Sequence, residues 1–200
     1  MALVLLKHLA RSTTVFHYTR TPVYWGIMPR IRDALGMAPG ERLLDVGCGT
    51  GLCAPLARGL YLGVDTALVS LTFAQRRFGD AQRHFALMSA GAMAVAPASF
   101  DKCAVVNVAH HLDADALDTL LTDVQRAVRG PVVLVDPAPD VGNALELAIL
   151  RHDRGEYVRP RAALRALLTR RYDIEHEETF HNHLHILPQV LFRLRPRERS

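Results

Sequence analysis

The sequence has few cysteines and no long apolar run. Its three cysteines, Cys48, Cys53 and Cys103, form no Cys-x-x-Cys pair and leave an odd one over, so neither a disulfide framework nor a structural zinc site is indicated. The apolar start, residues 1–6, meets charge at Lys7, and it is too short to span a bilayer and lacks the order of a signal peptide. We therefore expect a protein of the reducing cytoplasm that has no membrane span and begins with an amphipathic helix.

Internal repeats, low-complexity tracts and an evident linker are also missing. The length of 200 residues suits one globular domain with its own core. Arginines give the chain a net charge of +4, but they are scattered and become denser only at residues 193–199. Because no basic, aromatic-rich surface accompanies them, we interpret that stretch as a solvated tail and expect no nucleic-acid partner.

Strand-like and helix-like segments alternate along the chain. Short apolar runs predict buried strands at residues 42–46, 60–64, 84–88, 103–108 and 132–135, with helical spacing at 52–58, 67–78 and 113–128. Further helices are expected at 145–152 and 161–169, and the runs 172–180 and 186–194 are close enough to pair as an antiparallel hairpin. Such alternation predicts an α/β fold, with a parallel sheet covered by helices on both faces.

The residues before the first strand are predicted to be helical. Pro22 can open a helix that ends at Gly36. We therefore divide the chain into an N-terminal helical cap, residues 1–38, and a main domain, residues 39–200, within one globular unit.

A glycine-rich loop follows the first strand, Gly47-Cys48-Gly49-Thr50-Gly51. Glycines there let the backbone approach a ligand closely. A dinucleotide fingerprint needs another glycine where Leu52 stands, and the Asp45 carboxylate would repel a pyrophosphate but attract an ammonium group. Asp65, at the end of the second strand, would accept hydrogen bonds from ribose hydroxyls or else cap the helix at Ala67. These features disfavour a nicotinamide-dependent reductase.

Several motifs follow one another within residues 40–137. They are LLDVGCGTG at 43–51, GVD at 63–65, SFD at 99–101, NVAHHLD at 107–113 and GPVVLVDP at 130–137. In this order they resemble the class I S-adenosylmethionine-dependent methyltransferases. The resemblance implies a Rossmann-like, doubly wound, seven-stranded sheet whose C-terminal hairpin places the seventh strand beside the fifth. It also implies S-adenosyl-L-methionine as the cofactor.

The resemblance also implies a set of cofactor-binding residues. The methionine end would lie against Asp45 and the loop, the ribose against the end of the second strand, and the set is Asp45, Gly47, Cys48, Gly49, Gly51, Asp65, Thr66, Ser89, Ala90 and Asn107. The family often has an acidic residue after the third strand that binds the adenine amino group, and this sequence has none there. Ser89, a backbone carbonyl or apolar packing would have to substitute. That absence supports an alternative, a domain that binds S-adenosylmethionine or S-adenosylhomocysteine without turnover, or a partner subunit.

Candidate catalytic residues follow the fourth strand. His110 or His111 could deprotonate a hydroxyl acceptor, since histidine titrates near neutral pH; either could instead pack or cap the next helix. His111 matches the more usual histidine of the family, which favours a structural role for it and leaves His110 freer. Tyr18 and Tyr24 lie in the N-terminal segment that builds the acceptor pocket in related proteins, so we expect them at the substrate.

An alternation of histidines, His181, His183 and His185, would share one face of a strand. No carboxylate or cysteine completes a ligand set in sequence, so we expect no metal site and interpret them as surface or pocket residues. The sequence thus favours methyl transfer to a small-molecule acceptor, with O-methylation ahead of N- or C-methylation, by a monomer or homodimer.

Overall fold

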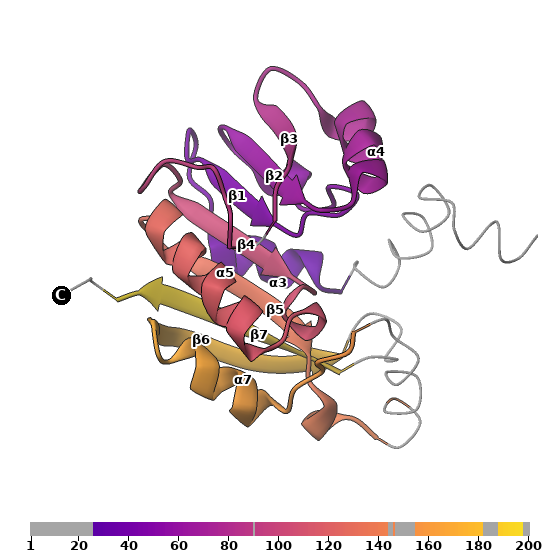
Figure 1. Ribbon diagram of the computed structural model, residues 1–200, viewed down its shortest axis with the longest axis vertical. Helices are drawn as coiled ribbons and strands as arrows, with labels where there is room; N and C mark the ends of the chain where they lie inside the picture. The colour runs from indigo at the N-terminus through magenta and orange to yellow at the C-terminus, as the bar shows by residue number, and fades with distance from the viewer. Residues whose placement is uncertain (1–25, 90, 144–145, 147–154, 182–187, 198–200) are drawn as a thin grey trace, which may run out of the picture.

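A seven-stranded sheet of order β3-β2-β1-β4-β5-β7-β6 organises the chain (Figure 1). The computed structural model describes residues 26–197 except 90, 144–145, 147–154 and 182–187. The strands are β1 Leu43–Val46, β2 Tyr61–Asp65, β3 Arg83–Leu87, β4 Lys102–Val106, β5 Val132–Pro137, β6 Tyr172–His181 and β7 Pro188–Pro196. β1 to β5 pair in parallel, and β7 lies antiparallel between β5 and β6. The predicted fold class is confirmed.

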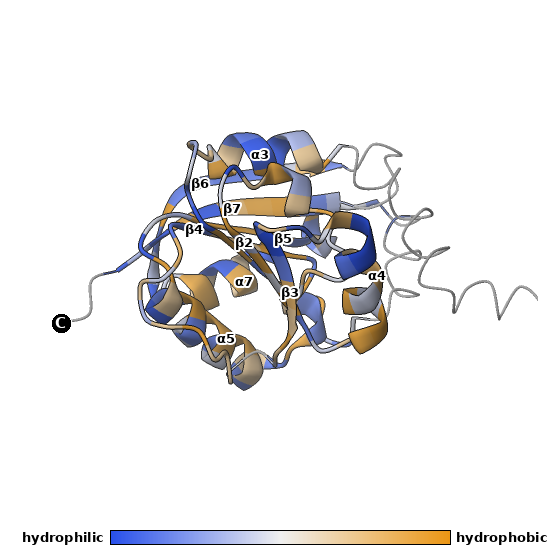
Figure 2. Cartoon of the chain, turned by 90° about the horizontal axis from the view of Figure 1, so that it is seen from above, coloured by the Kyte–Doolittle hydropathy of each residue, from blue (hydrophilic) through white to orange (hydrophobic). Residues whose placement is uncertain are grey.

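Helices cover both faces of this sheet (Figure 2). On one face lie α3 Met28–Leu35, α4 Leu68–Phe78 and η1 Ala54–Leu56, a single 3-10 turn. On the other face lie α5 Ala114–Ala127 and α7 Arg161–Leu168. The central strands β1 and β5 are buried along their whole length, as expected for strands covered on both sides.

The described part of the predicted cap packs into the main core. Ile31 and Leu35 of α3 are fully buried together with side chains of β4, β5 and β7. The helix ends where predicted, since Gly36 adopts φ 54° and its N–H donates to the Arg32 carbonyl oxygen. Helix α3 therefore belongs to the helical layer on one face of the sheet. Residues 1–25, with Tyr18 and Tyr24, fall outside the described residues.

The prediction of a helix at 52–58 is wrong. The chain makes only the turn η1 there, and Ala57 is already extended, with φ −66° and ψ 138°. Gly59 explains the short connection, because a Cβ on it would lie 2.6 Å from the backbone of Gly40. The chain has therefore already returned to the start of β2, with no room for a further helical turn. The helix predicted at 145–152 lies, apart from Glu146, outside the described residues.

Three arginines near the C-terminus do not form a solvated tail, contrary to our interpretation; Arg199, which the interpretation included, lies outside the described residues. Arg193 and Arg195 belong to β7, and both pair with Glu175 of β6. Arg197 follows the strand and pairs with Asp173 at 2.8 Å. The positive charges are thus balanced by acids of the neighbouring strand. Among the described residues, no helix is long and apolar enough to cross a membrane.

Candidate cofactor-binding and active site

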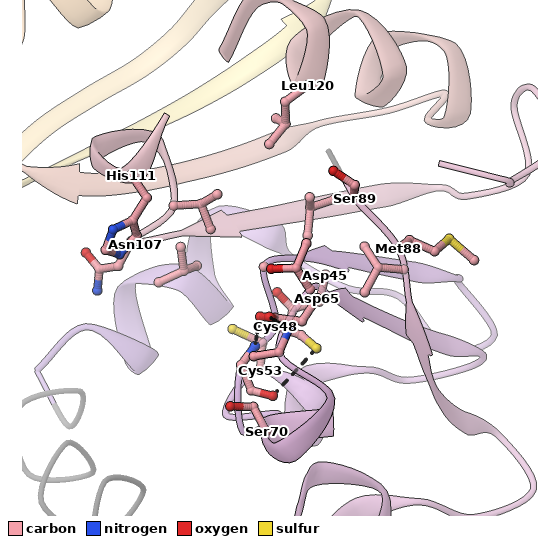
Figure 3. A pocket seen from close by; sticks show the side chains of 18 of the residues that line it. Asp45, Cys48, Cys53, Asp65, Ser70, Met88, Ser89, Asn107, His111 and Leu120 are labelled. Carbon is pink, nitrogen blue, oxygen red and sulfur yellow. Dashed lines mark hydrogen bonds between the residues drawn. The ribbon is translucent and has the colours of Figure 1, made fainter. Parts of the chain in front are cut away.

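A pocket of about 540 Å³ lies at the carboxyl ends of β1, β2 and β4 (Figure 3). The strand order reverses between β1 and β4, which is where open α/β sheets bind ligands. Its lining includes most of the predicted cofactor residues and one predicted catalytic residue: Asp45, Gly47, Cys48, Gly49, Asp65, Thr66, Ser89, Asn107 and His111. The sheet thus brings together residues from four separate segments of the sequence.

The glycine loop approaches the pocket with its backbone. Gly47 and Gly49 adopt φ 70° and 51°, in the left-handed region. A Cβ on Gly47 would lie 2.3 Å from Val108 Cγ2, whereas one on Gly49 would meet nothing within 4 Å. Gly51 does not line the pocket; a Cβ there would press on Phe85, Phe78 and Ala74. The third glycine therefore serves packing.

The N–H groups of Gly47, Cys48 and Gly49 already donate within the chain. Gly47 and Cys48 donate to the Val64 carbonyl oxygen at 2.8 and 3.0 Å, and Gly49 donates to Asp65 Oδ2 at 2.8 Å. In addition, η1 follows the loop in place of an α-helix. A pyrophosphate needs free N–H donors at a helix N-terminus, so this geometry argues against a dinucleotide.

Asp65 lies in the pocket wall and also accepts from the start of the following helix, as the second of its two predicted roles requires. Its Oδ2 accepts from Gly49, and its Oδ1 accepts from the N–H of Ala67, the N-cap of α4, at 2.8 Å. These bonds fix the carboxylate at the pocket wall. Since each carboxylate oxygen has a second lone pair, Asp65 can still accept from a ligand hydroxyl.

Asp45 lies beneath the loop, 2% exposed, and its Oδ2 accepts a hydrogen bond of 2.6 Å from the Tyr61 hydroxyl. Burial raises the pKa of Asp45 to about 7; the Tyr61 bond opposes this rise, and the charge of Asp65 adds to it. Tyr61 was not predicted from the sequence as a residue of this site. Residues two apart on a strand share a face. Gly63, two residues after Tyr61, therefore indicated that the Tyr61 side chain has space to extend over this strand toward Asp45.

At the end of the pocket where the resemblance places the adenine, the described residues after β3 include no acidic side chain, as the sequence indicated. Ser89 and Met88 line it after β3, and Leu120 of α5 faces them. Among the described lining residues the only carboxylates are Asp45 and Asp65, while Ala90 lies outside the described residues. Apolar walls with Ser89 are therefore what the described part of the chain offers to a base.

Asn107 follows β4 directly and lines the pocket with φ 55°, a conformation that asparagine tolerates better than most residues. Its N–H donates to the Val135 carbonyl oxygen at 2.8 Å. The chain then turns into η2, Ala109–His111. The left-handed residue thus directs the two histidines away from the line of the strand.

The structure reverses the expected exposure of the histidines. His110 is 1% exposed, and its Nδ1 lies 2.8 Å from Oδ1 of the buried Asp136. His111 is exposed and lines the pocket, with its ring centroid 4.1 Å from that of His110. Of the two predicted catalytic histidines, His111 therefore faces the pocket, and His110 packs beside it in the core.

The segment before α7 holds this turn in place. Arg159 donates to the carbonyl oxygens of Ala109 and Leu112 at 2.9 and 2.6 Å, and the Tyr157 N–H donates to that of His110. Gly155 lies so close that a Cβ on it would be 2.1 Å from His110 Cδ2. Sequence reasoning missed Asp136 and Arg159, because no local pattern links them to the histidines.

The alternating histidines are described only in part. His181 Nε2 lies 3.3 Å from Glu146 Oε1, while His183 and His185 lie outside the described residues. In the part of the chain that the structure describes, no group of three histidines, cysteines or acids could hold a metal ion. The expectation of no metal stays a prediction.

Residues 43–130 match the model of the methyltransferase domain family. This match supports the class I, S-adenosylmethionine-dependent methyltransferase that the motifs predicted, and S-adenosylmethionine is the cofactor of that family. A comparison with curated protein sequences finds no match.

Solved structures share the fold at low identity. A complex of the Haloferax volcanii Trm112 methyltransferase activator with a putative methyltransferase gives a TM-score of 0.76 at 12% identity, covering 97% of this chain and 96% of that chain. Magnesium protoporphyrin IX methyltransferase from Synechocystis PCC 6803, with bound S-adenosylhomocysteine, gives 0.69 at 17%, covering 90% and 88%. Geranyl diphosphate C-methyltransferase from Streptomyces coelicolor gives 0.71 at 14%, covering 86% and 75%. At these identities the likeness establishes the fold.

Proposed function

We propose that the protein transfers a methyl group from S-adenosylmethionine to a small-molecule acceptor, with a hydroxyl oxygen as the favoured acceptor atom. The main support is the pocket, because its lining includes both Asp45, whose carboxylate could attract an ammonium group, and the exposed histidine His111. The pocket residues fit the cofactor: Gly49 leaves open space for a ligand, Asp65 is aimed for hydroxyls, and the volume suits an organic molecule of this size.

The bound cofactor supplies an electrophilic methyl group, and the chain's residues align the acceptor and handle its proton. Asp45 and Asp65 hold the two ends of the methionine and ribose part by charge and hydrogen bonds. His111 accepts the hydroxyl proton as the acceptor oxygen attacks. Much of the remaining barrier is lowered by alignment and exclusion of water, which need no further catalytic side chain.

The preference for a hydroxyl acceptor is supported by His111 of this chain and by none of the structural neighbours. The structural neighbours include enzymes named for C-methylation and for a porphyrin acceptor, so the fold leaves the acceptor open. A second candidate function, cofactor binding without turnover or service as a partner subunit, is favoured by the described adenine end, which carries no carboxylate after β3.

Calorimetric titration with S-adenosylhomocysteine tests the proposal first. We expect saturable heat from the product and none from NADH, because the loop's N–H donors are already engaged. No heat with S-adenosylhomocysteine at millimolar concentration would contradict the proposal. Binding without methyl transfer to any of a panel of phenols, carboxylic acids and amines would favour the second candidate.

Replacing Asp65 with alanine should weaken S-adenosylhomocysteine binding by about 1–3 kcal/mol, because ribose hydroxyls and the Gly49 N–H lose their acceptor. Asp113→Ala is the matched control: Asp113 also accepts a backbone N–H, from Ala116 at 2.8 Å, but it does not line the pocket. Affinities of the two variants are compared by calorimetry. An Asp65 variant as tight as the Asp113 variant would rule out the ribose contact.

His111→Gln should slow methyl transfer to a hydroxyl acceptor by about 10²–10⁴-fold, the usual contribution of a general base. Its affinity for S-adenosylhomocysteine should change little, since the base acts on the acceptor. His84→Gln, at an exposed position of β3 away from the pocket, controls for loss of a surface histidine. Equal turnover of the two variants would remove His111 from the mechanism.

A further inference from the structure

Tyr61 contacts the proposed cofactor site through Asp45, which lies beneath the glycine-rich loop. It opens β2, is fully buried, and its hydroxyl donates to Asp45 Oδ2 at 2.6 Å. Its ring is tilted by 58° against Phe85, with the centroids 5.3 Å apart. Gly63 makes this path possible, because a Cβ there would lie 2.9 Å from the Tyr61 oxygen. Gly63 also stands directly opposite Asp45 in the β1–β2 register.

We propose that Tyr61 is a positioning residue for the cofactor's ammonium group: its hydroxyl keeps the Asp45 carboxylate ionised and oriented, and so sets the pH range in which the cofactor binds. This inference rests on the proposed function, since it assumes that the ammonium end lies at Asp45. A buried carboxylate that binds a cation must be charged before the cation arrives, and burial opposes that charge. A hydrogen bond to the charged form is the available compensation.

Tyr61 differs from the other charged and titratable groups around Asp45 in its effect on the Asp45 pKa. Asp65, on β2, is a second negative charge and raises the pKa of Asp45. Cys48 on the loop, Cys53 before η1 and Cys103 on β4 have thiol pKa values raised by burial, so they stay neutral at physiological pH. Among the described groups that act on Asp45, Tyr61 alone favours its ionised form.

The sign of the pH effect follows directly. Asp45, with its pKa raised to about 7, is protonated below that pH and then presents no charge to an ammonium group. Affinity for an ammonium-bearing ligand should therefore fall by about tenfold for each pH unit below the midpoint. Without the Tyr61 hydroxyl the carboxylate is harder to ionise, so the midpoint should move upward.

The experiment measures S-adenosylhomocysteine affinity by calorimetry between about pH 5.5 and about pH 8.5 for the unmodified protein, Tyr61→Phe and Asp45→Asn. We expect the Tyr61 variant to raise the midpoint by about one pH unit, and the Asp45 variant to bind weakly with no such dependence. An unmoved midpoint in Tyr61→Phe, a flat profile of the unmodified protein, or a persisting dependence in Asp45→Asn would each overturn the inference.

Methylthioadenosine is the matched probe, because it keeps the base, the ribose and the sulfur but has no ammonium group. Its affinity should be independent of pH in this range and the same for the unmodified protein and Tyr61→Phe. An equal loss of methylthioadenosine and S-adenosylhomocysteine affinity in the variant would show that Tyr61 merely supports the fold of the loop, and would overturn the inference. Failure of the unmodified protein to bind either ligand at any pH would instead contradict the proposed function.

Discussion

Gly47→Ala will abolish measurable S-adenosylhomocysteine binding and lower the free energy of unfolding by about 2–5 kcal/mol. Backbone strain and a steric clash both destabilise the folded state when alanine replaces Gly47. An alanine must adopt φ 70°, in the left-handed region where a Cβ meets its own backbone. The same Cβ would lie 2.3 Å from Val108 Cγ2, so the loop or the end of β4 has to move. Urea unfolding and calorimetric titration measure the two effects.

Gly49→Ala separates the two costs. Gly49 also has a positive φ, of 51°, but a Cβ on it would meet nothing within 4 Å, so its stability loss should stay near about 1–2 kcal/mol. Adding Val108→Ala to Gly47→Ala should restore part of the lost stability, because the clashing methyl group is removed. Equal losses for the two glycine variants, or no rescue by Val108→Ala, would show that Val108 does not restrict the loop.

The fold was largely predictable because its signals are local. Short apolar runs predicted the five parallel strands, and β2 and α4 lie within one residue of the predicted bounds. Where prediction failed, contacts between distant residues decided the conformation. Helical spacing at 52–58 gave way to the contact between Gly59 and Gly40, and the arginines at 193–197 are ordered by acids of β6.

The site was predictable to the extent that its residues end strands. Asp45, Asp65 and Asn107 come together because parallel strands place their carboxyl ends at one edge. The division of labour between the two histidines was not predictable, since adjacent residues of a turn give no periodicity. It depends on Asp136, at the end of another strand, and on Arg159, beyond it. Tyr61 was hidden for a related reason: its hydroxyl acts on another strand.

Asp136→Ala will destabilise the protein by about 3–5 kcal/mol, the cost of removing one partner from a buried ion pair or charge-assisted hydrogen bond. His110 and Asp136 are 2% and 3% exposed in their side chains, so water cannot readily replace the lost acceptor. Burial raises the pKa of Asp136, and the bond to His110 opposes that rise, so His110 is the main compensation for the buried Asp136 carboxyl. Urea unfolding near neutral pH measures the loss.

Two variants decide whether this loss comes from the pair. Asp136→Asn keeps an oxygen that can accept from His110 and should lose less stability than Asp136→Ala. Asp140→Ala removes a more exposed carboxylate that accepts the Arg161 N–H at 2.9 Å, and it should cost no more than about 1 kcal/mol. Since the same pair supports the turn that carries His111, Asp136→Asn should slow turnover more than it weakens S-adenosylhomocysteine binding. A proportional loss of both would mean that the pair stabilises the whole pocket and has no particular effect on His111.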